Sequence, residues 1–160
     1  MNQARAINRF EYMAEVFPDI GILRKFSSEQ ACALWDFMCL AVFVDETCSD
    51  WEATAIQRIG LMMPNLPNDH NKVKPIKAYM GQDIRTQRKV MRELSKKIGD
   101  ESAREATFKM LCVLSTIDEL ELEEIDFLDE AARALKIEPD MSEHFLRSSW
   151  ETCRAHYYAA

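Results

Sequence analysis

The sequence predicts an all-α protein, a single-domain bundle of about seven helices over residues 1–160, and three observations favour this class. Gly and Pro together make up nine of the 160 residues, which is too few for the turns of a β-sandwich or barrel. The chain is 48% hydrophobic and 29% charged, as expected of a globular domain with a substantial core. Apolar residues recur at helical spacing in successive segments, and no segment has a convincing strand pattern.

The first half of the chain has clear helix boundaries. Apolar positions over residues 7–17 follow helical spacing and predict a first helix that ends at Pro18. Ser-Ser-Glu-Gln at 27–30 and Ser-Asp-Trp-Glu at 49–52 are capping boxes, and each predicts the start of a helix. The Pro- and Asn-rich segment 64–69 is expected to be a loop.

The second half contains signals for four further helices. Pro75 suits the first turn of a helix that we expect to reach Ile98 and to stop at Gly99. Asp100 should cap a helix that ends near Asp118, and apolar positions over 125–135 mark the inner side of the next one. A capping box at 140–143 predicts the start of the last helix.

Two segments of the chain resemble each other. Residues 37–45 align with residues 110–118: in both, an apolar helix ends at an aspartate, with a cysteine six residues earlier. A short acidic turn follows each, and then a helix with Glu52 in its first turn in one copy and Glu123 or Glu124 in the other. We therefore expect two pseudo-repeated α-hairpins related by a pseudo-twofold axis.

Charge is strongly segregated along the chain. The total is 20 basic against 27 acidic residues, a net charge of −7, which disfavours nucleic acid as a partner. Residues 72–97 nevertheless carry nine basic and two acidic residues, whereas eight of the thirteen residues 118–130 are acidic. The basic helix predicted over 74–97 is suited to docking on an acidic protein partner or on anionic lipid. The alternative is a solvated helix face that partly neutralises its acidic neighbours.

Hydropathy and cysteine usage predict a cytoplasmic protein that is not transmembrane. The strongest apolar run, 31–44, is about 14 residues long, shorter than the roughly 18–20 residues that cross a bilayer. The N-terminus lacks the apolar run of a signal peptide. Five cysteines with no CxxC pair favour buried thiols in a reducing compartment. Cys48, in a predicted turn, is the best candidate for a reactive or metal-binding thiol.

No catalytic constellation is evident, so we expect a protein that is not an enzyme, with no catalytic or cofactor-binding residues. The chain shows neither a Ser-His-Asp arrangement nor a phosphate-binding loop. The acidic turns offer oxygen ligands of the kind that Ca²⁺ and Mg²⁺ select, but loops counted from Asp45 or Asp118 do not fit an EF-hand. Glu-x-x-His pairs for di-iron and paired cysteines for zinc are missing. Helix capping is the alternative role for these carboxylates.

The acidic hairpins resemble those of a known family. Residues 117–128, continuing through 131–137, are similar to the second hairpin of the TerB-like tellurite-resistance family, and residues 44–52 look like its first acidic turn. The resemblance covers about residues 28–145. Typical members have a glycine after each aspartate and a Leu-Gly-Ile sequence after the last of these helices.

This chain departs from the family pattern at those glycines, but it retains the acids. Glu46 and Glu119 follow the two aspartates, and Lys136 stands between Leu135 and Ile137. The resemblance implies that a divalent cation (Ca, Mg or Zn) binds through a set of four acids: Asp45, Glu52, Asp118 and Glu124.

The resemblance also implies a function. It indicates a non-enzymatic module of the bacterial tellurite and chemical-stress response, located in the cytoplasm or at the inner face of the inner membrane and working with partner proteins. A homodimer is compatible with this reading. The alternative function is a pure protein–protein interaction scaffold with no metal site.

Overall fold

The described part of the chain is helical throughout. The computed structural model describes residues 13–14, 16–42, 49–70, 83–118 and 120–159, and the side chains of these only as far as residue 155. Within these residues the regular elements are η1 (Ile20–Lys25), α2 (Ser28–Val42), α3 (Asp50–Leu61), α5 (Ile84–Ile98), α6 (Glu101–Thr116), α7 (Leu122–Ala134) and α8 (Pro139–Ala159). The all-α prediction is confirmed. The short 3₁₀ helix η1 was not predicted, and most of the first predicted helix lies outside the described residues.

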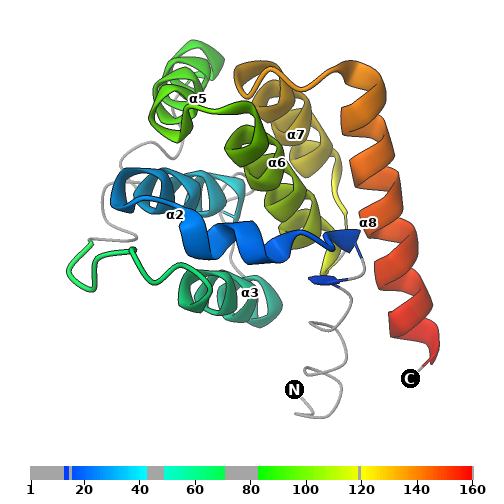
Figure 1. Cartoon of the computed structure of the whole chain (residues 1–160). Helices are drawn as coiled ribbons and strands as arrows, with labels where there is room; N and C mark the ends of the chain where they lie inside the picture. Colours follow the sequence, from blue (N-terminus) through cyan, green and yellow to red (C-terminus); the bar gives the residue numbers. More distant parts are fainter. Residues whose placement is uncertain (1–12, 15, 43–48, 71–82, 119, 160) are drawn as a thin grey trace.

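Helices α2 and α6 form the centre of the molecule (Figure 1). They pack against each other, α5 packs mainly on α2, and α8 packs along α6. Both central helices are apolar on several sides and contribute fully buried residues such as Leu34, Phe37, Met110 and Leu111. No helix in the described ranges is long and apolar enough to cross a membrane.

Local capping explains where several helices begin. The Ser27 hydroxyl accepts the Gln30 N–H at 3.1 Å, and the Gln30 side chain accepts the Ser27 N–H at 3.0 Å. The same reciprocal pair joins Ser49 and Glu52 before α3. Asp100 accepts the N–H three residues further on, at the start of α6. All three predicted caps are confirmed, because each rests on residues that are close in the sequence.

The basic helix starts later than the sequence predicts. Asp83 has extended backbone angles (φ −68°, ψ 165°), and its carboxylate accepts the Thr86 N–H at 2.8 Å. A single helix from Pro75 to Ile98 is therefore wrong: α5 begins at Ile84, and residues 71–82 lie outside the described residues. A helix start at Asp83 is favoured because the N-cap carboxylate accepts an N–H of the first turn, which has no acceptor within the helix.

The last helix begins one residue before its predicted cap. Pro139 is the first residue of α8, so Asp140 lies in the first turn and does not form the predicted capping box with Glu143. Proline is favoured at this position because its fixed φ is helical and it has no N–H to satisfy. Glu143 instead pairs with Arg147 one turn later, at 2.6 Å.

Two polar contacts set the position of α7 and α8 on the bundle. The Arg104 side chain donates to the carbonyls of Leu135 and Gly99, which follow the ends of α7 and α5. Thr116 and Ser149 share a hydrogen bond of 2.7 Å between their buried hydroxyls and thus join α6 to α8. Helices α5 and α7 also pack side by side and form one face of the molecule.

Candidate docking surface between helices α5 and α7

One exposed side of α5 is basic over its whole length. Four cationic residues recur at helical spacing, at positions i, i+4, i+7 and i+11. All four are exposed, and none makes an ion pair with any residue in the described ranges. We call this set the basic stripe: Arg85, Lys89, Arg92 and Lys96. The other side of α5 is buried in the core through Met91, Leu94, Ser95 and Ile98.

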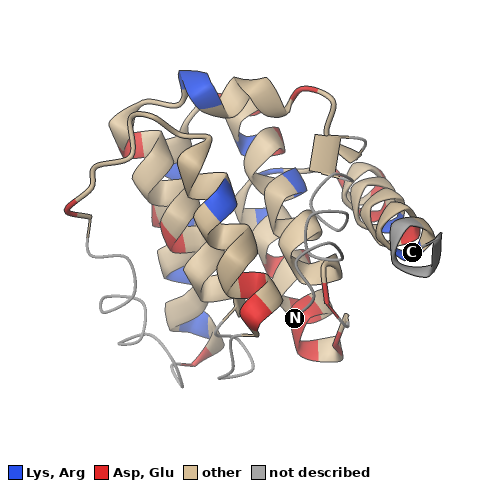
Figure 2. Ribbon diagram, turned by 90° about the horizontal axis from the view of Figure 1, so that it is seen from below, with Lys and Arg blue, Asp and Glu red and all other residues tan. Residues whose placement is uncertain are grey.

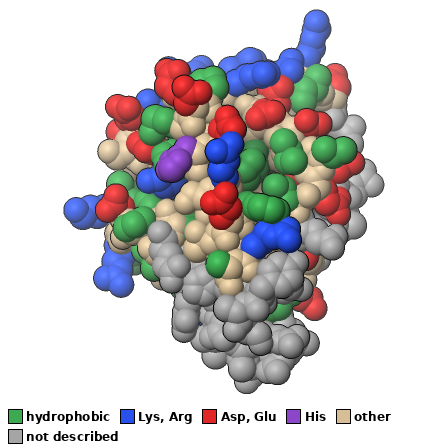
Figure 3. All heavy atoms as spheres, turned by 90° about the vertical axis from the view of Figure 1, so that its right-hand side faces the viewer, with side chains coloured by type: hydrophobic (Ala, Val, Ile, Leu, Met, Phe, Trp, Pro, Cys, Tyr) green, Lys and Arg blue, Asp and Glu red, His purple; other side chains and the backbone are tan. Residues whose placement is uncertain are grey.

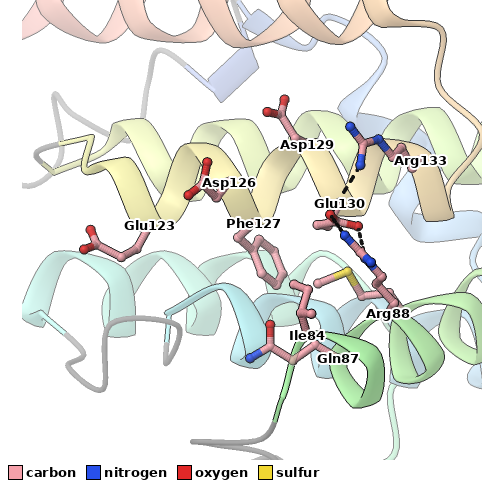
Figure 4. A pocket seen from close by; sticks show the side chains of 10 residues that line it. Ile84, Gln87, Arg88, Glu123, Asp126, Phe127, Asp129, Glu130 and Arg133 are labelled. Atoms are coloured by element: carbon pink, nitrogen blue, oxygen red, sulfur yellow. Dashed lines mark hydrogen bonds and ion pairs between the residues drawn. The ribbon is translucent and has the colours of Figure 1, made fainter.

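An arginine–glutamate pair joins α5 to α7 beside this stripe (Figure 4). The Arg88 guanidinium donates two hydrogen bonds to Glu130, Nε to Oε2 at 2.9 Å and Nη2 to Oε1 at 2.8 Å. Arg133 approaches the same carboxylate at 3.3 Å. The hydrogen bonds from Arg88 hold the pKa of Glu130 below its usual value, even though partial burial acts the other way. We call these three residues the seam.

The exposed side of α7 is acidic. Glu123, Asp126 and Asp129 are exposed and recur every three residues, and within the described part of the chain they have no basic partner. We call them the acidic stripe. They border a groove of about 470 Å³ between α5 and α7, which is also lined by the apolar side chains of Ile84 and Phe127 (Figure 4).

The face is therefore bipolar, with basic residues on one side of the seam and acidic residues on the other. Figure 2 marks the acidic and basic positions along the helices of the molecule. In contrast, the face seen in Figure 3 has acidic, basic and apolar side chains interspersed. The basic helix is predicted by the sequence, but the seam is not, because Arg88 and Glu130 are 42 residues apart and no local pattern links them.

The four predicted metal ligands have different environments. Asp45 lies outside the described residues, and Asp118 is exposed at the end of the α6 segment. Glu52 and Glu124 are buried, 9% and 7% exposed. Each is the third residue of its helix, α3 or α7, so the two carboxylates occupy equivalent positions in the predicted hairpins.

The described ligands do not make a metal site by themselves. Among the residues that the structure describes, no three His, Cys, Asp or Glu side chains are grouped to hold a metal ion. Glu52 already serves as the reciprocal partner of Ser49 in the capping box. A cation bound at these turns therefore needs Asp45 or another residue outside the described ranges.

The described cysteines are buried or half-buried, and one histidine contacts an aspartate. Cys39, Cys112 and Cys153 are buried, as predicted, and Cys48 lies outside the described residues. Burial raises the pKa of the Cys112 thiol, and burial together with the charge of Asp36 raises that of Cys32. His70 contacts Asp36 at 2.9 Å and connects the loop after α3 to α2. Raised thiol pKa values disfavour nucleophilic chemistry at Cys32 and Cys112.

The described part of the chain is thus an all-α protein with a bipolar face formed by α5 and α7. Comparison of the chain with family models, curated proteins and solved structures finds no match.

Proposed function

We propose that this chain is a non-enzymatic binding module that docks on an anionic surface through the basic stripe of α5. The observation that carries the proposal is the line of four exposed cations with no ion pair in the described part of the chain. The apolar side of α5 is occupied by the core, so docking is electrostatic and involves no insertion of this helix. Each cation near an anionic membrane contributes on the order of 1 kcal/mol.

The test is co-sedimentation with vesicles of phosphatidylcholine, with and without phosphatidylglycerol, and a parallel pulldown on immobilised polyglutamate. The variant Arg85→Glu/Lys89→Glu should lose most binding, and added salt should weaken binding by the wild type. Arg24→Glu/Lys25→Glu is the matched control, because both residues are exposed and belong to η1, outside the basic stripe. Binding to vesicles alone assigns a membrane surface, and binding to polyglutamate alone assigns an acidic protein. Equal binding by the two variants contradicts the proposal.

The second candidate function is divalent-cation binding at the acidic turns by Asp45, Glu52, Asp118 and Glu124. The equivalent, buried positions of Glu52 and Glu124 support it. A hard cation such as Ca²⁺ or Mg²⁺ takes oxygen ligands, and bound charge would relieve repulsion among neighbouring carboxylates. Zn²⁺ is the third cation to test.

Metal titration with thermal unfolding tests this function. Millimolar Ca²⁺, Mg²⁺ or Zn²⁺ should raise the Tm, since a ligand at 100 times its Kd stabilises the folded state by about 2.7 kcal/mol. Glu124→Gln should abolish the rise, whereas Glu121→Gln, an exposed residue just before α7, should retain it. No shift with any of the three metals favours the alternative, an interaction scaffold without a metal site.

The resemblance to the TerB-like family supports a place in the bacterial tellurite and chemical-stress response. We propose a cytoplasmic module that is held at the inner membrane face when the basic stripe docks there. Bacteria that express the wild-type chain should tolerate more tellurite than those that express Arg85→Glu/Lys89→Glu. Equal tolerance would show that docking through the basic stripe is not required for this response.

A further inference from the structure

We infer that the face between α5 and α7 is a self-association surface, on which two copies of the chain pack about a twofold axis along the seam. In this arrangement the basic stripe of each copy meets the acidic stripe of the other. The inference goes beyond the proposed function, because it requires the acidic side of the face as well as the basic side.

The two helices of the face carry exposed charges of opposite sign. The exposed cations belong to α5 and the exposed carboxylates to α7, and the Arg88–Glu130 contact lies between the two helices. A twofold rotation about a line between the two stripes exchanges left and right. It therefore places the cations of one copy over the carboxylates of the other, which makes the surface self-complementary.

The seam leaves both stripes available. Arg88 and Arg133 both contact Glu130, so this carboxylate is already paired within one copy. The seven stripe residues, in contrast, have no ion pair within the described ranges. Like-charged carboxylates three residues apart on α7 repel one another, and opposing cations would relieve this repulsion.

Apolar side chains are exposed where the two helices begin. Ile84, 47% exposed, is the first residue of α5 and lies beside the groove, and Leu122, 76% exposed, is the first residue of α7. Buried apolar side chains together with charged ones are usual in a specific interface. A second copy covers these side chains and satisfies both stripes, whereas an acidic partner satisfies only the basic stripe.

The test is sedimentation equilibrium of the full chain at micromolar concentration. We expect dimers at about 0.05 M salt and monomers at about 0.5 M, because exposed charges are screened at high ionic strength. Arg85→Glu/Lys89→Glu and Asp126→Lys/Asp129→Lys should each be monomeric at low salt, since each opposes like charges in the dimer. An equimolar mixture of the two variants should restore a heterodimer, because the unchanged acidic stripe of the first variant pairs with the unchanged basic stripe of the second, and the substituted positions carry opposite charges in the two variants.

The outcomes separate this inference from the proposed function. Asp126→Lys/Asp129→Lys should still bind anionic vesicles, because its basic stripe is intact, although it no longer dimerises. All substituted residues are exposed, and circular dichroism with thermal unfolding confirms that each variant folds. A wild type that stays monomeric at low salt overturns the inference. So does a dimer that survives both pairs of substitutions, or a mixture that does not associate.

Discussion

Lys136 has left-handed backbone geometry directly after α7. Its φ is 59°. The turn is closed by two hydrogen bonds: the Ile137 N–H donates to the Ala132 carbonyl at 2.9 Å, and the Lys136 N–H donates to the Arg133 carbonyl at 3.2 Å. This is the Schellman arrangement, in which glycine is usual. The TerB-like pattern has glycine at the same place, so the residue that departs from the pattern is also the strained one.

Lys136→Gly should therefore raise the free energy of unfolding. The left-handed conformation costs a residue with a Cβ about 1–2 kcal/mol, and the greater freedom of glycine in the unfolded chain offsets about 0.5–1 kcal/mol of the gain. We expect a net increase of about 0.5–1 kcal/mol in urea unfolding. Lys136→Ala is the control, because it removes the charge but retains the Cβ. If both variants have the same stability, the backbone argument is wrong.

At the scale of elements, the packing of α3 on α2 depends on Gly60. A Cβ built at this position lies 2.5 Å from Cζ3 of Trp35, whose side chain is buried. Gly60→Ala gains about 1 kcal/mol of helix propensity, but overpacking a core costs about 1–3 kcal/mol. Since the indole is rigid, we expect a net loss of stability in chemical denaturation. Gly21→Ala, with no atom within 4 Å of its new Cβ, should show no such loss.

A double-mutant cycle identifies the partner in this contact. Trp35→Phe removes the ring that a Cβ at Gly60 would meet, so the cost of Gly60→Ala should be smaller in that background. Strictly additive effects of the two substitutions would show that the close approach to Trp35 is not the cause.

Elements were predictable from the sequence where their signals are local. The caps at Ser27, Ser49 and Asp100 each involve residues three positions apart, and all three are present. The start of α5 was misplaced because it was assigned from Pro75, whereas the folded chain has its N-cap at Asp83. The basic stripe is predictable from helical spacing within one segment. The position of the acidic stripe beside it is not, because only tertiary packing brings α7 beside α5.

At the scale of the whole molecule, pH changes stability through many carboxylates at once. The net charge of −7 means that acidification first relieves self-repulsion of the folded state. Glu130 acts in the opposite direction. Its folded-state pKa is lowered, chiefly by hydrogen bonds from Arg88, so its contribution to stability is present above its unfolded pKa of about 4.3 and is lost as pH falls through the folded value.

Comparison of wild type with Glu130→Gln isolates this contribution, because the other carboxylates are common to both proteins. We expect the wild type to be the more stable at neutral pH, with the difference in free energy of unfolding shrinking as the pH falls below about 4. Urea unfolding over a pH series measures it, and Glu138→Gln, an exposed residue with no ion pair in the described chain, should show no such trend. A difference that is constant with pH would mean that Glu130 stabilises the α5–α7 face by packing alone. In that case the charge of Glu130 would not be needed to hold α5 against α7.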